Sequence, residues 1–265
     1  MSNTDLALSW TVLGAGTAAP HAHRTPSGHL LQTPSTTLLV DMGPGTLWRL
    51  AAAGVDWANL DAIVLSHAHL DHTLDLAALM FAANLPGHGR TRPLPIVASP
   101  ACKAVMDRLG AALERWFVPR GFDVPWILVE QGAVQLGDVS LELAPVVHHP
   151  SSLGMRFEAA GRSIAYSGDS DRCDALVHLA RVADLAVLEC STDVGRKVGG
   201  HMTPVEVAAV AEEARAGAVA LVHMVPELDG VDLEAAVRHH GFRGPVKRCP
   251  DGARFGFTAS TPTAT

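Results

Sequence analysis

Four side chains that can bind a metal ion occupy six consecutive positions. The run Ser66-His67-Ala68-His69-Leu70-Asp71-His72 directly follows the apolar segment Ile63–Leu65, which has the composition of a buried strand. Imidazole nitrogens and carboxylate oxygens suit zinc. In a loop leaving a strand end, the first two histidines can point to one metal while Asp71 and His72 turn toward a second. The alternative, a solvated turn with chance histidines, leaves the polar motifs downstream unexplained.

Three of those motifs are Val147-His148-His149-Pro150, Tyr166-Ser167-Gly168-Asp169-Ser170 and Leu221-Val222-His223. Asp169 and His223 each follow an apolar strand. A ligand at a strand end is held by rigid backbone, which is what a preorganised site requires. These two residues therefore occupy strand-end positions that suit a metal ligand.

The run 66–72 matches the HxHxDH signature of the metallo-β-lactamase superfamily, and the other motifs resemble that superfamily in order. Leu13-Gly14-Ala15-Gly16-Thr17, Pro26-Ser27-Gly28 and Leu39-Val40-Asp41-Met42-Gly43 are similar to the N-terminal region of its ribonuclease Z-like members. The resemblance covers nearly the whole chain.

The resemblance implies a dinuclear site. It puts His67, His69 and His148 on one divalent cation, Asp71, His72 and His223 on the other, and Asp169 between them. The ligand set favours zinc, with Mn or Fe as alternatives. Two cations about 3.5–4 Å apart can trap a bridging hydroxide, which would be the nucleophile.

Two assignments depend on neighbouring residues. His148 and His149 compete for one ligand position, and the spacing to Gly154 in the family pattern favours His148. Asp41 has a family counterpart that supports the metal loop, where a carboxylate can fix a histidine tautomer. An acid that caps the turn at 43–45 is an equal alternative for Asp41.

His201 is a candidate general acid, and Asp71 is the other catalytic candidate. Gly200-His201-Met202-Thr203 resembles the GHST segment of ribonuclease Z, whose histidine donates to the scissile phosphate or the leaving group. An imidazole with a near-neutral pKa can serve in that role. Met202 departs from the family serine, and an ordinary loop before a helix is the alternative.

The segment between His148 and Asp169 bears on the substrate. Ribonuclease Z enzymes carry a long tRNA-gripping arm there, whereas this chain has 20 intervening residues, room for two strands and a turn. The chain is more similar to armless members, among them bacterial cyclic-nucleotide phosphodiesterases. We therefore predict a hydrolase of a small phosphodiester. The alternative is another ester class, namely a sulfate ester, phosphotriester, lactone or thioester, and tRNA 3′-processing is a less favoured third.

The elements that must position these residues alternate along the chain. Short runs rich in Val, Ile and Leu predict strands at Leu8–Leu13, Thr37–Val40, Ala62–Leu65, Pro95–Ala98, Val139–Leu143, Ser163–Tyr166, Leu185–Leu188 and Ala218–Val222. Ala-rich stretches predict helices at Leu47–Ala53, Leu74–Ala83, Ala101–Trp116, Cys173–Ala180, Pro204–Ala216 and Leu233–His240. The fold class is α/β, and the resemblance implies a four-layer αβ/βα sandwich.

Thr203, Pro204 and Glu206 predict a capped helix start. The aromatic stretch Trp116, Phe117, Phe122 and Trp126 could wall a substrate pocket, but core packing is the simpler expectation for each residue.

Composition limits the partners. The 265-residue chain has 27 acidic and 20 basic residues, a net charge of −7, so it offers no global positive field for nucleic acid or an anionic membrane. We expect a small-molecule substrate and, from scattered cysteines and the lack of a leader pattern, a cytoplasmic location. Analogy with the family suggests a homodimer. One domain over residues 1–257 is predicted, with a disordered tail at 258–265.

Overall fold

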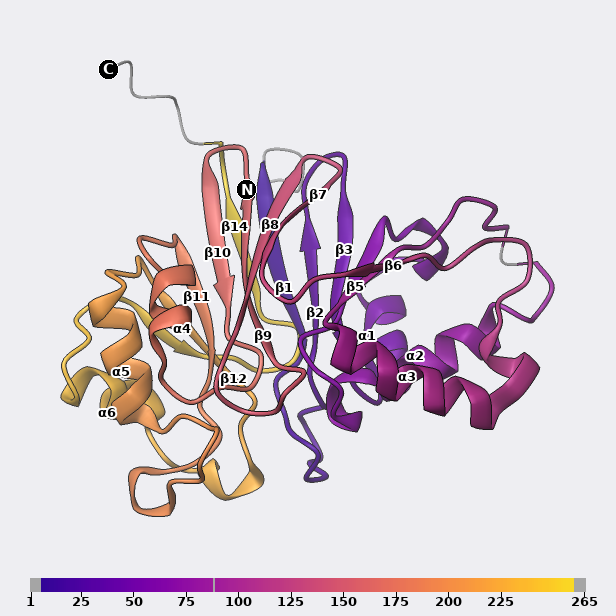
Figure 1. Cartoon of the computed structure of the whole chain (residues 1–265). Helices are drawn as coiled ribbons and strands as arrows, with labels where there is room; N and C mark the ends of the chain where they lie inside the picture. Colours follow the sequence, from indigo (N-terminus) through magenta and orange to yellow (C-terminus); the bar gives the residue numbers. More distant parts are fainter. Residues whose placement is uncertain (1–5, 88, 260–265) are drawn as a thin grey trace.

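The computed structural model describes residues 6–87 and 89–259. Two seven-stranded sheets lie face to face, with helices covering the outer face of each (Figure 1). The predicted four-layer αβ/βα sandwich is confirmed. Within the described ranges, no helix is long and apolar enough to cross a bilayer.

The first sheet has the strand order β14-β1-β2-β3-β4-β5-β6. Strands β3 to β6 pair in parallel, whereas β1 pairs antiparallel with both β2 and β14. The bounds are β1 Leu8–Gly14, β2 Gly28–Gln32, β3 Thr37–Met42, β4 Ala62–Val64, β5 Ile96–Ala98, β6 Trp126–Leu128 and β14 Arg254–Phe257.

The second sheet has the order β13-β12-β11-β10-β9-β8-β7. Its strands β10 to β13 pair in parallel, and β7 to β10 form antiparallel hairpins. The bounds are β7 Gly132–Leu136, β8 Val139–Pro145, β9 Leu153–Ala159, β10 Arg162–Tyr166, β11 Leu185–Glu189, β12 Val219–Val222 and β13 Val246–Arg248.

Six α-helices of the described chain form the outer layers, three on each side (Figure 1). Helices α1 Thr46–Ala52, α2 Leu70–Ala82 and α3 Pro100–Leu113 cover the first sheet; α4 Asp174–Leu179, α5 Pro204–Glu213 and α6 Leu233–His239 cover the second. Short 3₁₀ helices lie at η1 Trp57–Asn59, η2 Glu114–Phe117, η3 Val194–Arg196 and η4 Pro226–Leu228.

The two cores follow from the alternation of side chains along a strand. In β3, Leu38 and Val40 pack into the core between the sheets, where Trp10 is fully buried, while Leu39 packs into the core beneath α1, α2 and α3. Because both faces of β3 are covered, its run of apolar residues is continuous rather than alternating with polar ones.

All eight predicted strands and all six predicted helices occur in the structure, with shifted ends. Six strands were not predicted: β2, β6, β7, β9, β13 and β14. One placement was wrong: Asp71 and His72 lie not in a loop but in the first turn of α2, which begins at Leu70 rather than at Leu74.

The helix start at Thr203 is confirmed. Its side chain caps α5, Glu206 bonds back to the Thr203 backbone, and Pro204 occupies the first turn. The single-domain assignment to residues 1–257 stays a prediction. Of the predicted tail, Ser260–Thr265 lie outside the described residues, while Thr258 O accepts a hydrogen bond from Arg162 Nε.

Candidate metal centre

The predicted ligands meet at one edge of the molecule, where several strands end. His67 and His69 follow β4, Asp169 follows β10 and His223 follows β12. Strands β10, β11 and β12 are parallel neighbours, so their carboxyl ends lie at the same edge of the second sheet. His148 follows β8 and completes the group.

One set of ligand atoms comprises His67, His69, His148 and Asp169. His69 Nδ1 lies 3.0 Å from His67 Nε2 and 3.1 Å from His148 Nε2. Asp169 Oδ2 lies 3.6 Å from His67 Nε2 and 3.7 Å from His148 Nε2. Three ring nitrogens and one carboxylate oxygen thus converge on one point.

A second set comprises Asp71, His72 and His223, again beside Asp169. His223 Nε2 lies 3.3 Å from Asp71 Oδ2, and His72 Nε2 lies 3.9 Å from the same oxygen. Asp169 is 3.2 Å from His72 Nε2 through Oδ1 and 3.4 Å from His223 Nε2 through Oδ2. Asp169 therefore faces both sets, as a bridging ligand would.

Buried atoms without partners show that this cluster fits a cation. His72 Nε2 and Asp169 Oδ1 are both buried and form no hydrogen bond. Burial lowers the pKa of His67 well below its ordinary value and lowers that of His148 to about 4, so both rings are neutral at pH 7. Neutral imidazole is the form that binds a metal.

The charges of Asp71 and of the groups around His72 also suit a bound cation. Burial raises the pKa of Asp71, but the hydrogen bond with His223 and the neighbouring histidine charges outweigh burial and bring the pKa to about 2. Burial likewise opposes the charge on His72, yet Asp169 and Asp41 raise its pKa well above the ordinary value. Negative charge therefore surrounds His72, as it would around a bound divalent cation.

Asp41 holds the metal-binding residues in place through hydrogen bonds. Its carboxylate accepts hydrogen bonds from Ser66 N and Ser66 Oγ, each at 2.7 Å, and from His72 Nδ1 and Tyr166 Oη, each at 2.8 Å. The His72 proton is thereby held on Nδ1, which leaves Nε2 free for a ligand. Of the two roles considered for Asp41, these contacts support the metal loop rather than the turn at 43–45.

Backbone strain is concentrated around these residues. Asp41 and His223 adopt left-handed φ values of 59° and 54°, which are uncommon for residues other than glycine. Beside Asp169, Gly168 has φ of 53°, and a Cβ there would lie 2.9 Å from Ser66 Cβ. The strand-end turns that deliver the ligands therefore depend on these local conformations.

The structure separates His148 from His149. His148 Nδ1 donates to Gly200 O at 3.0 Å, so its Nε2 faces the cluster as an acceptor. His149 Nδ1 instead lies 2.7 Å from Ser151 Oγ, and His149 belongs to neither set of ligand atoms. This geometry agrees with the choice of His148.

His201 forms a third set of close ligand atoms with Asp169 and His223, and it is held by a carboxylate that was not predicted from the sequence. His201 Nδ1 lies 3.0 Å from Glu189 Oε1, and Glu189 is fully buried at the end of β11. Burial lowers the pKa of His201, but the hydrogen bond and charge of Glu189 outweigh it and raise the pKa. The missed signal was an acid directly after the apolar run Leu185–Leu188.

A hollow of about 300 Å³ opens over the cluster. Ala18, Val198 and Val225 contribute its apolar walls, and Ser191 and His201 lie on the wall formed by the segment after β11. A small ester can therefore reach the ligand atoms through this hollow.

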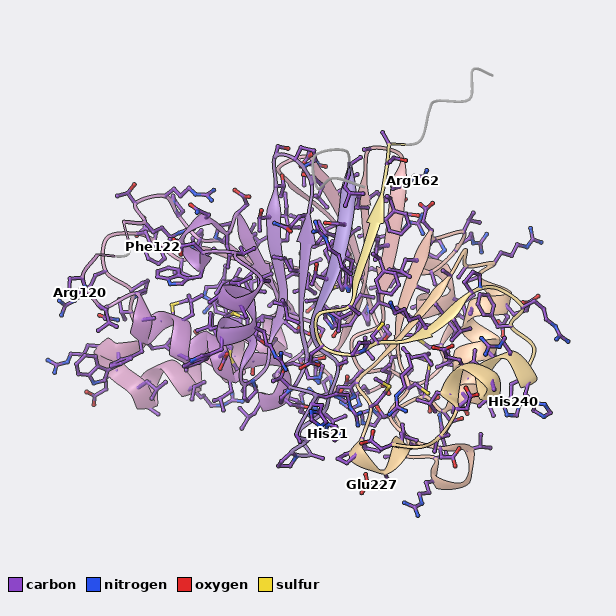
Figure 2. The ribbon with its side chains drawn as sticks, turned by 180° about the vertical axis from the view of Figure 1, so that it is seen from behind. His21, Arg120, Phe122, Arg162, Glu227 and His240 are labelled. Atoms are coloured by element: carbon purple, nitrogen blue, oxygen red, sulfur yellow. The ribbon has the colours of Figure 1, made fainter. Side chains whose placement is uncertain are left out.

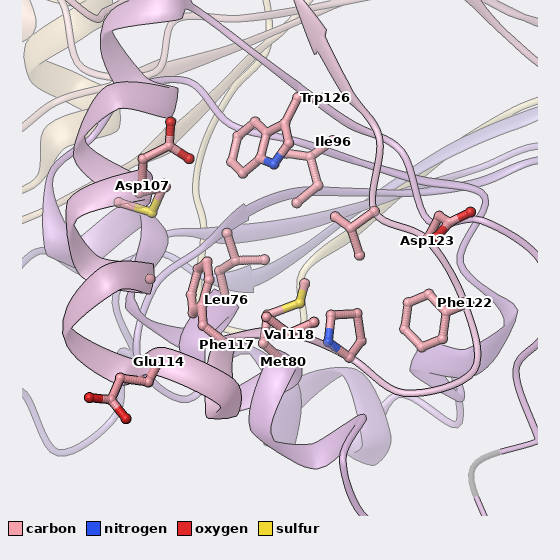
Figure 3. Close-up of a pocket in the computed structure, with 14 residues that line it drawn as sticks. Leu76, Met80, Ile96, Asp107, Glu114, Phe117, Val118, Phe122, Asp123 and Trp126 are labelled. Atoms are coloured by element: carbon pink, nitrogen blue, oxygen red, sulfur yellow. The ribbon is translucent and has the colours of Figure 1, made fainter.

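The aromatic stretch contributes to a different hollow. Phe117, Phe122 and Trp126 surround a hollow of about 430 Å³ between α2 and α3, away from the cluster (Figure 3). Trp116 packs instead on Phe81, with ring centroids 5.4 Å apart. Phe117, Phe122 and Trp126 thus pack in the helical core of the first sheet, as expected, whereas Trp116 lies on the surface and is 43% exposed.

Comparison with known proteins supports the family. The model of the beta-lactamase superfamily domain matches residues 36–224, most of the chain. The chain belongs to this superfamily. A ribonuclease Z from Mycobacterium bovis is 29% identical over 247 residues, covering 83% of this chain and 87% of that protein. The probable metallo-hydrolase YhfI of Bacillus subtilis is 30% identical, covering 81% and 86%.

Solved structures give the same result. The metallo-beta-lactamase fold protein YhfI from Bacillus subtilis superposes with a TM-score of 0.81 at 26% identity, covering 94% of this chain and 98% of that one. A diphosphatase from the PhnP family gives a TM-score of 0.77 at 21% identity, covering 95% and 98%, which shows a shared fold. The prediction of a metal-dependent hydrolase is confirmed at the level of the family, and this fold implies divalent metals, for which the cluster offers ligands.

Proposed function

We propose that the protein is a dinuclear metal-dependent phosphodiesterase that acts on a small phosphodiester. Two divalent cations, preferentially zinc, would be held by His67, His69 and His148 and by Asp71, His72 and His223, with Asp169 between them. When bound, they would polarise the phosphoryl group and lower the pKa of an attacking water.

The chain's own residues divide the remaining work. Asp71 is ionised at neutral pH, because its pKa is about 2, and can accept a hydrogen bond from the attacking water and orient it. His201, whose pKa is raised, can donate a proton to the departing ester oxygen. Val198 and Val225 reduce contact of the reacting group with bulk water.

The pairing of His201 with buried Glu189 is the observation that carries the choice of a phosphodiester. An alkoxide leaves poorly without a proton, whereas a thiolate leaves readily, so a carboxylate-held imidazole beside the cluster suits an oxygen ester. Thioesters are thereby disfavoured. Sulfate esters, phosphotriesters and lactones are alternatives to be tested on the same site.

The relatives support phosphoryl chemistry, since their names include a ribonuclease Z and a diphosphatase. Likeness to ribonuclease Z makes tRNA 3′-processing the second candidate. Two features favour a small substrate: the segment between His148 and Asp169 forms only the hairpin of β9 and β10, and the net charge is −7. Binding of a long polyanion would need a positive surface.

Hydrolysis of bis(4-nitrophenyl) phosphate by zinc-reconstituted protein tests the proposal. The matching phosphomonoester, sulfate ester and phosphotriester, a lactone and a precursor tRNA are assayed in parallel. Preference for the diester, abolished by a chelator and restored by zinc, is the expected result. Preference for another ester overturns the substrate class, and cleavage of the tRNA alone establishes the second candidate.

Location and assembly stay predictions. A cytoplasmic location is an expectation from the sequence, and a homodimer is an expectation from analogy with the family. Cell fractionation tests the first, and light scattering of the purified protein tests the second.

A further inference from the structure

A second hollow adjoins the one over the metal cluster. Its volume is about 600 Å³, and the two hollows share Thr192, Val198 and Val225 as lining residues. The second hollow continues from these residues to Leu228 and Arg196. The two hollows therefore adjoin at these three residues.

The walls and the rim of this hollow differ in character. Val198, Val225 and Leu228 make an apolar wall, and Val198 is 50% exposed. Asp193, Arg196 and Glu227 are exposed and line the same hollow, and none of the three forms a salt bridge within the described part of the chain. Glu227 lies at the end of the molecule where the loop carrying His21 also projects (Figure 2).

The apolar wall and the charged rim together indicate which kind of substituent the hollow would bind. An apolar wall favours a ring or chain without charge, because burying apolar surface is favourable. Arg196 offers hydrogen-bond donors and Glu227 offers acceptors, so the edge of the ring should carry both acceptors and donors. A planar heteroaromatic group meets these demands, whereas a short alkyl group uses only part of the wall and a polyanion would be repelled by Glu227.

One segment of the chain contributes lining residues to both hollows. Residues 191–203, between β11 and α5, carry Thr192, Arg196 and Val198 and also His201. An ester group placed at the cluster beside His201 would therefore lie next to the second hollow.

We propose that this second hollow is the subsite for an organic substituent of the substrate, and that Val198, Arg196 and Glu227 make it selective for a heteroaromatic ring. The inference rests on the proposed phosphodiesterase function. It assigns specificity to residues outside the ligand cluster.

Three diesters with the same 4-nitrophenolate leaving group test it: the ethyl, 2-phenylethyl and 2-(uracil-1-yl)ethyl esters of 4-nitrophenyl phosphate. Because the bond broken is the same, ratios of kcat/KM report how the other substituent binds. We expect the phenylethyl ester to exceed the ethyl ester about tenfold, and the uracil ester to exceed both. Equal values for the three esters overturn the proposal.

Variants test the contributions of the apolar wall and of the charged rim independently. Val198→Ser should lower the phenylethyl to ethyl ratio about fivefold, and the double variant Arg196→Ala, Glu227→Ala should remove only the advantage of uracil over phenyl. Val194→Ser is the matched control, since Val194 lies in the same segment, is 45% exposed and lines neither hollow; its ratios should equal those of the wild type.

The outcomes distinguish the two claims. Hydrolysis of all three esters with ratios that the Val198 and rim variants do not change overturns the subsite while leaving the phosphodiesterase intact. Absence of diester hydrolysis by the zinc-loaded protein overturns the proposed function and the subsite with it.

Discussion

The metal-binding run at 66–72 and the segment at 191–203 border the same hollow but are built differently. In the metal-binding run, which ends in the first turn of α2, His67 and His72 are fully buried, and the ring of His72 is fixed by Asp41. In the other segment, residues 193–199 are all exposed. Residues that would perform the chemistry are thus held by buried contacts, whereas residues that would contact the organic part of a substrate lie at the surface.

The contrast has a physical reason. Ligand atoms must be placed within a fraction of an ångström, which requires packed and hydrogen-bonded support. Groups that only select a substrate contribute smaller free energies, and exposed positions tolerate change. His201 combines both kinds of environment, because it lies in the exposed segment but is anchored to buried Glu189. The following predictions test this division.

Asp169→Ala should have the largest effect, because Asp169 faces both sets of ligand atoms. Even residues that only support metal ligands change affinity or activity about 10–100-fold, so loss of a shared ligand should exceed about 100-fold. Metal content by atomic emission and the rate of diester hydrolysis should fall together. A variant that retains two metal ions per chain would contradict the bridging assignment.

His201→Ala should lower the rate of the chemical step without changing metal binding. For a diester whose leaving group is an alkoxide, we expect kcat to fall about 10²–10⁴-fold, since a positioned proton donor contributes that much, while the metal content stays at the wild-type level. Equal rates in the variant and the wild type would remove His201 from the mechanism. His149→Ala is a control, because that ring turns toward Ser151.

Asp41→Asn should weaken metal binding without removing a ligand. The amide cannot accept all the hydrogen bonds that Ser66, His72 and Tyr166 now donate, so the His72 tautomer is no longer fixed. Affinity for zinc should fall about 10–100-fold, as measured by competition with a chromogenic chelator. Unchanged affinity would show that the buried support of the loop is not needed.

Glu189→Gln should change the pH profile. The protonated imidazole of His201 is the donor, so the wild-type rate should fall as pH rises through its raised pKa. Removal of the Glu189 charge lowers that pKa, and the falling limb should move to lower pH. Profiles of kcat against pH, measured with a diester whose leaving group is an alkoxide, give the shift for both proteins. Falling limbs at the same pH would show that Glu189 does not set the pKa of the proton donor.

Tyr166→Phe should have the smallest effect. The variant loses the hydrogen bond from Tyr166 Oη to Asp41, but Asp41 keeps its bonds to Ser66 and His72. The free energy of unfolding should fall by about 1–2 kcal/mol in urea titrations. A larger loss would mean that the Asp41 contacts act as one cooperative unit.

Much of the fold could be predicted from the sequence, because buried central strands are marked by local apolar runs. Strands such as β4 and β11 and capped helices such as α5 carry that signal themselves. The strands that escaped prediction are β2, β6, β7, β9, β13 and β14. Several of them, such as β7 and β14, have exposed or half-exposed residues, so their identity depends on pairing rather than on composition.

The sequence by itself also determined which residues the site would bring together. His67, His148, Asp169 and His223 follow strand ends in an order that matches a known superfamily, and the structure brings their ligand atoms close together. The start of α2 escaped because Asp71 and His72 resemble a polar loop until the helix is seen to begin at Leu70.

Only the tertiary structure decided the supporting contacts. Asp41 lies 25 residues before Ser66 and 125 before Tyr166, and Glu189 lies 12 before His201, so no local pattern connects these partners. The same holds for the second hollow, whose walls come from residues 192–198 and 225–228. Spacing along the chain reveals ligands on one loop or strand end, whereas contacts between distant segments exist only after the sheets have packed face to face.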